Sequence, residues 1–166
     1  MSLILHDYIE AAIIGCFFSK LANKLKINKM KRVTGIGGIF FKSQAPDTLK
    51  DWYKVHLGLE TDAYGTNFEW RTSDDKEALA FTQWSPFKDD TTYFNPSKKD
   101  FMINYRVENL TELHQLLIEE GVTILDEITE FEYGKFLHII DPEGTKIELW
   151  EPNDIVYNTM IEGRTK

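Results

Sequence analysis

The order of hydrophobic and polar positions along the chain predicts a strand, a helix and three further strands. Residues 34–41 are glycine-rich and then β-branched and aromatic, which predicts a strand. Apolar residues spaced three and four apart between Leu49 and Leu57 predict a helix, and Gly58 directly after them suits a left-handed helix end. Strands are then predicted over residues 60–64, 67–72 and 78–84.

The same order of elements returns after a polar, proline-containing connection over residues 85–99. Residues 101–107 predict a strand, and Asn109 with Glu112 forms a capping pair for a helix that ends at Gly121. Further strands are predicted over residues 128–133, 136–140 and 146–150, with a tight turn at residues 141–144 between the last two.

The two sets of elements also match at individual residues. Trp84 and Pro86, at the end of the first set, recur as Trp150 and Pro152 at the end of the second. We therefore interpret the pattern as an internal repeat of two βαβββ modules in one α+β domain. The predicted bounds are residues 30–155 for the domain, about 33–86 and 100–152 for the modules, and 156–166 for a C-terminal tail.

Residues 1–29 differ in composition from the predicted domain. An apolar run at residues 11–18 is followed by several lysines, and the run is too short to span a bilayer. We therefore predict no membrane span. Two interpretations stay open: an extension upstream of a natural start at Met30, and an amphipathic helix that packs on the domain, a partner or a membrane surface.

Composition and charge narrow the classes of partner. Of the 166 residues, 42% are apolar, which is typical of a globular protein. The single cysteine, Cys16, excludes an internal disulfide framework and favours a reducing, cytoplasmic setting. The formal net charge is −8, and residues 1–32 carry six basic against two acidic side chains, so the acidic excess lies in the predicted domain. This charge argues against nucleic acid as a partner. It could attract a cationic ligand, or it serves solubility alone.

Two motifs carry a resemblance to a known family. The first is Trp52-Tyr53 followed by Leu57-Gly58-Leu59. The second places Gly134 before the turn Asp141-Pro142-Glu143-Gly144, which leads into Ile147-Glu148-Leu149. With the repeat, residues 33–152 resemble the vicinal-oxygen-chelate superfamily of glyoxalases, bleomycin-resistance proteins and extradiol dioxygenases. The resemblance implies two paired modules whose sheets form an open barrel around a small-molecule cavity, often completed in a homodimer.

The resemblance also indicates where a metal would bind, because metal-using members take one ligand from the first strand and one from the last strand of each module. These four positions fall here on Gly35, Thr82, Met102 and Glu148. Only Glu148 suits a divalent metal, since glycine has no side chain, threonine is a weak ligand and methionine is too soft. We therefore predict no cofactor and disfavour a divalent metal.

The remaining candidates are polar and aromatic residues of the strands. A turn at residues 141–145 would place His138 opposite Glu148, where the carboxylate would orient the imidazole as a general base or simply satisfy it. The repeat places Glu69 and Thr82 at the equivalent positions of the first module. The aromatic residues predicted to line a cavity, with plain core as the alternative, are Phe40, Trp84, Tyr105 and Trp150.

Three functions are compatible with these features. The first is a metal-independent small-molecule-binding protein with an aromatic or cationic ligand. The second is a lyase or isomerase that uses Glu148 with His138 or with an atypical metal site. The third is a dimeric interaction scaffold in which the basic N-terminal segment binds the partner.

Overall fold

The first half of the domain forms one helix and three strands. The computed structural model describes residues 31–162, and the extension predicted over residues 1–29 lies outside them. Strand β1 (Val33–Ser43) is followed by helix α2 (Pro46–Leu57), β2 (Thr66–Arg71) and β3 (Leu79–Lys88). As predicted, α2 stops at Gly58, whose φ of 67° is accessible to glycine at little cost.

The second half repeats this order with additional short strands. Strand β4 (Phe101–Val107) leads into α3 (Leu110–Glu119), where the side chain of Asn109 accepts a hydrogen bond from the Glu112 amide as the predicted cap. The chain continues as β5 (Thr123–Ile124), β6 (Thr129–Phe131), β7 (Gly134–Ile140), β8 (Lys146–Pro152) and helix α4 (Asp154–Met160). No helix within residues 31–162 is long and apolar enough to cross a membrane.

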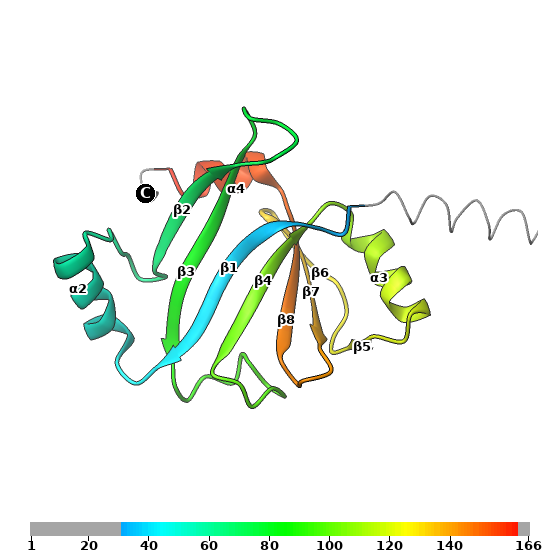
Figure 1. Ribbon diagram of the computed structural model, residues 1–166, viewed down its shortest axis with the longest axis horizontal. Helices are drawn as coiled ribbons and strands as arrows, with labels where there is room; N and C mark the ends of the chain where they lie inside the picture. Colours follow the sequence, from blue (N-terminus) through cyan, green and yellow to red (C-terminus); the bar gives the residue numbers. More distant parts are fainter. Residues whose placement is uncertain (1–30, 163–166) are drawn as a thin grey trace, which may run out of the picture. The chain divides into compact units, whose positions relative to one another are not determined.

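The strands join into one open, eight-stranded sheet in an α+β fold (Figure 1). Their order is β2-β3-β1-β4-β8-β7-β5, with β6 paired to β7. Within each half the first and last strands pair in parallel, β1 with β3 and β4 with β8, while β1 and β4 join the halves antiparallel. The internal repeat therefore appears as two matching sets of three strands, β2-β3-β1 and β4-β8-β7, on either side of the β1–β4 pairing, and β5 and β6 extend the second set through β7.

The outer face of the sheet is covered by helices at both sides. Helix α2 packs on β1 and β3, and α3 packs on β7 and β8. The leucines of α3 that were expected to form its apolar face are buried: Leu110, Leu113, Leu116 and Leu117. Helix α4 lies instead on the inner face, where Tyr157 packs against Phe81 of β3. The rest of the inner face is left for the candidate site.

Two differences from the predicted elements have physical causes. No strand forms over residues 60–64, because Lys50 Nζ binds the carbonyl oxygens of Asp62 and Ala63, and the Asp62 side chain accepts the amide hydrogens of Tyr64 and Gly65. The backbone groups of this segment are thus satisfied without a strand partner. Residues 156–160, which were assigned to a tail, belong to α4, whose Tyr157 is buried.

Candidate functional site

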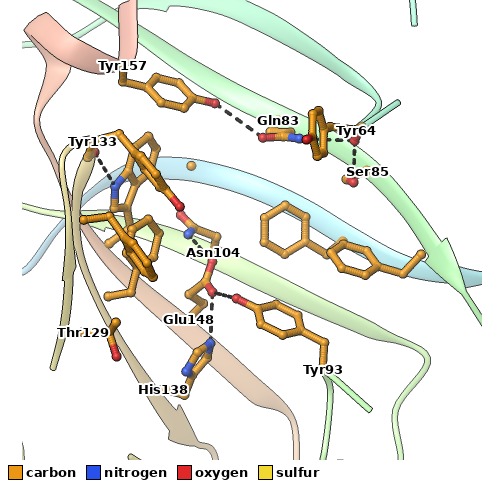
Figure 2. A pocket seen from close by; sticks show the side chains of 16 residues that line it. Tyr64, Gln83, Ser85, Tyr93, Asn104, Thr129, Tyr133, His138, Glu148 and Tyr157 are labelled. Carbon is orange, nitrogen blue, oxygen red and sulfur yellow. Dashed lines mark hydrogen bonds and ion pairs between the residues drawn. The ribbon is translucent and has the colours of Figure 1, made fainter. Parts of the chain in front are cut away.

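The inner face of the sheet bounds a cavity of about 450 Å³. Strand alternation explains how the sequence builds it, since every second residue of β3, β7 and β8 points inward. Nine of the sixteen lining residues are aromatic, and the set contains one carboxylate, one histidine and no lysine or arginine (Figure 2). The lining residues are Gly37, Phe40, Tyr64, Gln83, Ser85, Phe87, Tyr93, Asn104, Thr129, Phe131, Tyr133, Phe136, His138, Glu148, Trp150 and Tyr157.

Glu148 of β8 is the polar centre of the cavity. Its Oε1 accepts a hydrogen bond from Asn104 Nδ2 at 2.6 Å, across the parallel β4–β8 pair. Its Oε2 faces His138 Nε2 at 3.0 Å and also accepts a hydrogen bond from the Tyr93 hydroxyl. The residue is only 2% exposed. Three donors therefore stabilise a buried carboxylate that would otherwise be costly to desolvate.

His138 links Glu148 to a second carboxylate nearer the solvent. Its Nδ1 lies 2.5 Å from Asp126 Oδ2, and its backbone amide donates to Asp126 Oδ1 at 2.8 Å. The side chain of Asp126 is 43% exposed, whereas that of His138 is 11% exposed. Asp126, His138 and Glu148 thus form a continuous hydrogen-bonded chain from the surface to the cavity.

The charges of this chain shift the pKa values of its members. Burial lowers the pKa of His138, but the hydrogen bond and charge of Glu148, with the hydrogen bond to Asp126, outweigh it, and the net pKa is raised. Burial and the adjacent Glu148 carboxylate raise the pKa of the Tyr93 hydroxyl. The pKa of Lys146, whose Nζ binds the Tyr93 carbonyl oxygen, is lowered chiefly by burial. The arrangement therefore favours a protonated His138 between two carboxylates.

Four of the eight candidate residues line the cavity. The predicted pairing of His138 with Glu148 is confirmed by the register of β7 and β8. Phe40 and Trp150 line the same cavity. The structure therefore brings the predicted polar pair and two of the four predicted aromatic residues together at one cavity.

The other four candidates lie elsewhere. Glu69 forms an ion pair with Arg71, and the Thr82 hydroxyl donates to the Ile36 carbonyl. Trp84 packs against Tyr53 of α2. These placements correct the expectation that the three residues face the cavity.

The inward positions of β3 were predicted one residue out of step, and the metal positions on β1 and β4 were predicted two residues out. Gln83 and Ser85 line the cavity, so Thr82 and Trp84, at alternate positions, point to the opposite face of β3. By the same alternation Tyr105 is excluded because its neighbour Asn104 points inward. Thr82, Trp84 and Tyr105 therefore do not line the cavity for one physical reason, the alternation of side chains between the two faces of a strand.

The four strands also do not supply a metal-ligand set. Gly37 and Asn104 occupy the inward positions where Gly35 and Met102 were expected, and Met102 is fully buried in the core. With Gln83 and Glu148 this gives one carboxylate, two amides and a glycine. Glycine has no side chain, a single carboxylate supplies little charge for a divalent metal, and the Glu148 oxygens already accept three protein hydrogen bonds. Within residues 31–162 no group of three His, Cys, Asp or Glu side chains could hold a metal ion.

Sequence reasoning missed three residues of the hydrogen-bonded network around His138 and Glu148. Asn104 carries an amide, whereas the metal-ligand pattern of the superfamily points only to histidine and acidic residues. Tyr93 and Asp126 were missed because they lie in the connections before β4 and before β6, where no periodic pattern exists. The signal that the sequence offered for Asp126 was its position just before the strand predicted over residues 128–133.

Solved structures with the same arrangement identify the fold. Methylmalonyl-CoA epimerase from Mycobacterium tuberculosis matches with a TM-score of 0.51 and 20% identity, over 76% of this chain and 93% of that chain. The epimerase from Streptomyces coelicolor in complex with 2-nitronate-propionyl-CoA matches with a TM-score of 0.54 and 15% identity, over 73% and 99%. The chain has the vicinal-oxygen-chelate fold.

Other comparisons do not extend beyond this fold. A glyoxalase/bleomycin resistance protein/dioxygenase superfamily member from Vibrio splendidus 12B01 matches with a TM-score of 0.44 and 12% identity, over 74% of this chain and 99% of that one. No protein-family model matches the sequence, and no curated protein matches it. The vicinal-oxygen-chelate fold alone does not define a function, so only the residues of the site can indicate one.

Proposed function

We propose that the domain binds a neutral or cationic aromatic small molecule in the cavity around Glu148. The observation that carries the proposal is the lining, with nine aromatic residues, a single carboxylate and no lysine or arginine. Aromatic faces attract flat apolar bodies and cations, and a carboxylate repels anions. A volume of about 450 Å³ is in the range of small-molecule sites.

The same lining argues against the ligand of the epimerases as this chain's ligand. Coenzyme A carries phosphates, and sites for phosphate use arginine, lysine or helix N-termini. The residues that line the described cavity include no cationic side chain other than His138, which is held between Asp126 and Glu148. We also propose that binding needs no metal, because Asn104, Tyr93 and His138 already supply the donors that hold Glu148.

Three indole compounds test the charge preference directly. Tryptamine, 3-ethylindole and indole-3-propionate share one aromatic body and carry a positive, zero and negative charge at neutral pH. Isothermal titration should give tighter binding for tryptamine than for indole-3-propionate by about tenfold or more, since one unfavourable charge contact costs on the order of 1–2 kcal/mol.

Matched variants assign the preference to the cavity. Glu148→Gln should reduce the difference between tryptamine and indole-3-propionate, whereas Glu69→Gln removes an exposed carboxylate outside the cavity and should leave it unchanged. Equal or tighter binding of the anion, or no binding of any of the three compounds, would overturn the proposal.

The Asp126–His138–Glu148 chain favours a second function, acid–base catalysis in the same cavity. A chain of titratable groups from an exposed carboxylate to a buried one is able to move a proton between solvent and a bound molecule. The test compound is 2-indanone, a ketone whose acidic C–H bonds lie between the carbonyl group and a fused benzene ring. Nuclear magnetic resonance in D₂O should show exchange of these hydrogens faster than in buffer, and Glu148→Gln should abolish the difference. Exchange at the buffer rate would remove this function from consideration.

A further inference from the structure

The Glu148 carboxylate is shielded from solvent although it lies in the wall of a cavity. It is 2% exposed because its two oxygens are hydrogen-bonded to three covering groups, the side chains of Asn104, His138 and Tyr93. Oε2 faces two of these groups, which use both of its lone pairs. A ligand that donates a hydrogen bond to Oε2 must therefore displace one of them.

Two of the three covering groups are fixed in the sheet. Asn104 belongs to the central strand β4 and is itself 2% exposed. His138 belongs to β7, and Asp126 holds it at both the backbone amide and the ring. Moving either group would break strand contacts as well as the bond to Glu148.

Tyr93 is the covering group that does not belong to a strand. It lies in the connection between β3 and β4, and its side chain reaches from the solvent, at 39% exposure, to the Glu148 carboxylate. Its ring stacks on Phe87 with centroids 5.6 Å apart.

The backbone at residue 93 is held in place. Lys146 Nζ binds the Tyr93 carbonyl oxygen at 2.7 Å, and the next residue, Phe94, is fully buried. Motion of Tyr93 is therefore a rotation of its side chain, and the rest of the connection stays where it is.

We propose that Tyr93 is the specificity-determining gate of this cavity: its hydroxyl donates a hydrogen bond to Glu148 Oε2, and a ligand N–H or O–H takes its place. The inference rests on the proposed binding function and narrows the ligand class. Preferred ligands are aromatic molecules that carry a hydrogen-bond donor, such as a primary ammonium. A permethylated ammonium has the charge but lacks the donor, so it gains nothing from displacing Tyr93.

The gate makes a prediction opposite to that of an ordinary contact residue. Tyr93→Phe removes the hydrogen bond that stabilises the closed state, so a larger fraction of the protein is competent to bind. Because hydrogen bonds to charged groups are among the stronger ones, the Kd of tryptamine should fall about tenfold to a hundredfold. The Kd of N,N,N-trimethyltryptammonium should stay within about twofold of its wild-type value.

Isothermal titration of the wild type, Tyr93→Phe and Tyr105→Phe with both compounds tests the gate. Tyr105→Phe is the matched control, because Tyr105 is outside the lining of the cavity. Thermal melts of the variants establish that they are folded. Binding of tryptamine that is tighter in Tyr93→Phe than in the wild type, and unchanged in Tyr105→Phe, supports the gate.

The remaining outcomes separate the two proposals. If the wild type binds tryptamine and Tyr93→Phe binds it equally or more weakly, Tyr93 is a contact residue and the gate is overturned while the binding function stands. If neither protein binds either compound, the proposed function itself is overturned, and the gate with it. If Tyr93→Phe fails to fold, Tyr93→Leu replaces it, since it too lacks the hydroxyl, and the same criteria apply.

Discussion

Replacement of Glu148 by alanine is expected to destabilise the domain strongly. The change removes the acceptor of three donors in a residue that is 2% exposed, and leaves the Asn104 amide, the Tyr93 hydroxyl and the His138 ring facing an empty space. Loss of one partner of a buried charged pair costs about 3–5 kcal/mol. The three bonds share one carboxylate, so their contributions do not add. We therefore expect the free energy of unfolding to fall by about 4 kcal/mol.

Glu148→Gln is the matched variant with nearly the same shape. The new amide keeps one oxygen for Tyr93 and His138. Its nitrogen would face the Asn104 side chain, whose Oδ1 has no hydrogen-bond partner among the described residues and can accept if the Asn104 amide turns over. The loss should then be limited to charge, at about 1–2 kcal/mol.

Urea unfolding of the wild type, Glu148→Ala, Glu148→Gln and the surface control Glu69→Ala measures these differences at constant pH. The reasoning predicts the order Glu69→Ala, Glu148→Gln, Glu148→Ala from least to most destabilised. A Glu148→Ala protein within about 1 kcal/mol of the wild type, or a Glu148→Gln protein as unstable as Glu148→Ala, would refute the account of the buried network.

Two further predictions concern other groups of the domain. The raised pKa of His138 means that the native state holds its proton more tightly than the unfolded chain does. This stabilisation is complete below about pH 6.5 and is lost as the pH rises through the raised pKa. The Tm advantage of the wild type over His138→Gln should shrink over that range, and a constant difference would contradict the prediction. Arg106 is bound by both oxygens of Asp154, is 4% exposed in its side chain and lies against Trp150. Arg106→Ala should therefore cost about 3 kcal/mol in urea unfolding, and more than Asp154→Asn. The reverse order would show that the unpaired Arg106 charge costs more than its lost packing, and would contradict the prediction.

Periodic patterns predicted most of the strands and the two helices α2 and α3, and a tight turn predicted one residue pair of the site. The turn at residues 141–145 sets the register of β7 against β8, which is why His138 could be placed opposite Glu148 from sequence. Helix ends were predictable because Asn109 and Gly58 have local roles that do not depend on tertiary contacts.

Residue-level transfer from one module to the other was less reliable. Trp84 and Trp150 match in sequence, yet Trp150 lines the cavity and Trp84 packs on α2. A shift of one residue along a strand reverses the face of every side chain, so a correct fold can accompany a wrong face. Irregular pairing adds to this, because the register of β1 with β4 shifts twice, between Val33 and Gly35 and between Ile36 and Gly38. Groups on connections, such as Tyr93, reach the site only through tertiary structure.

Helix α4 has a consequence for the way the chain is made. It follows the second module in sequence, but the Tyr157 hydroxyl donates to Asn67 Oδ1 of β2 while its ring packs edge-on against Trp150 of β8. A nascent chain that has emerged only as far as β8 therefore lacks the group that satisfies Asn67, a residue of the first module that is 1% exposed. Vectorial synthesis can form strand pairs early, but the aromatic wall of the cavity closes only after α4 has left the ribosome.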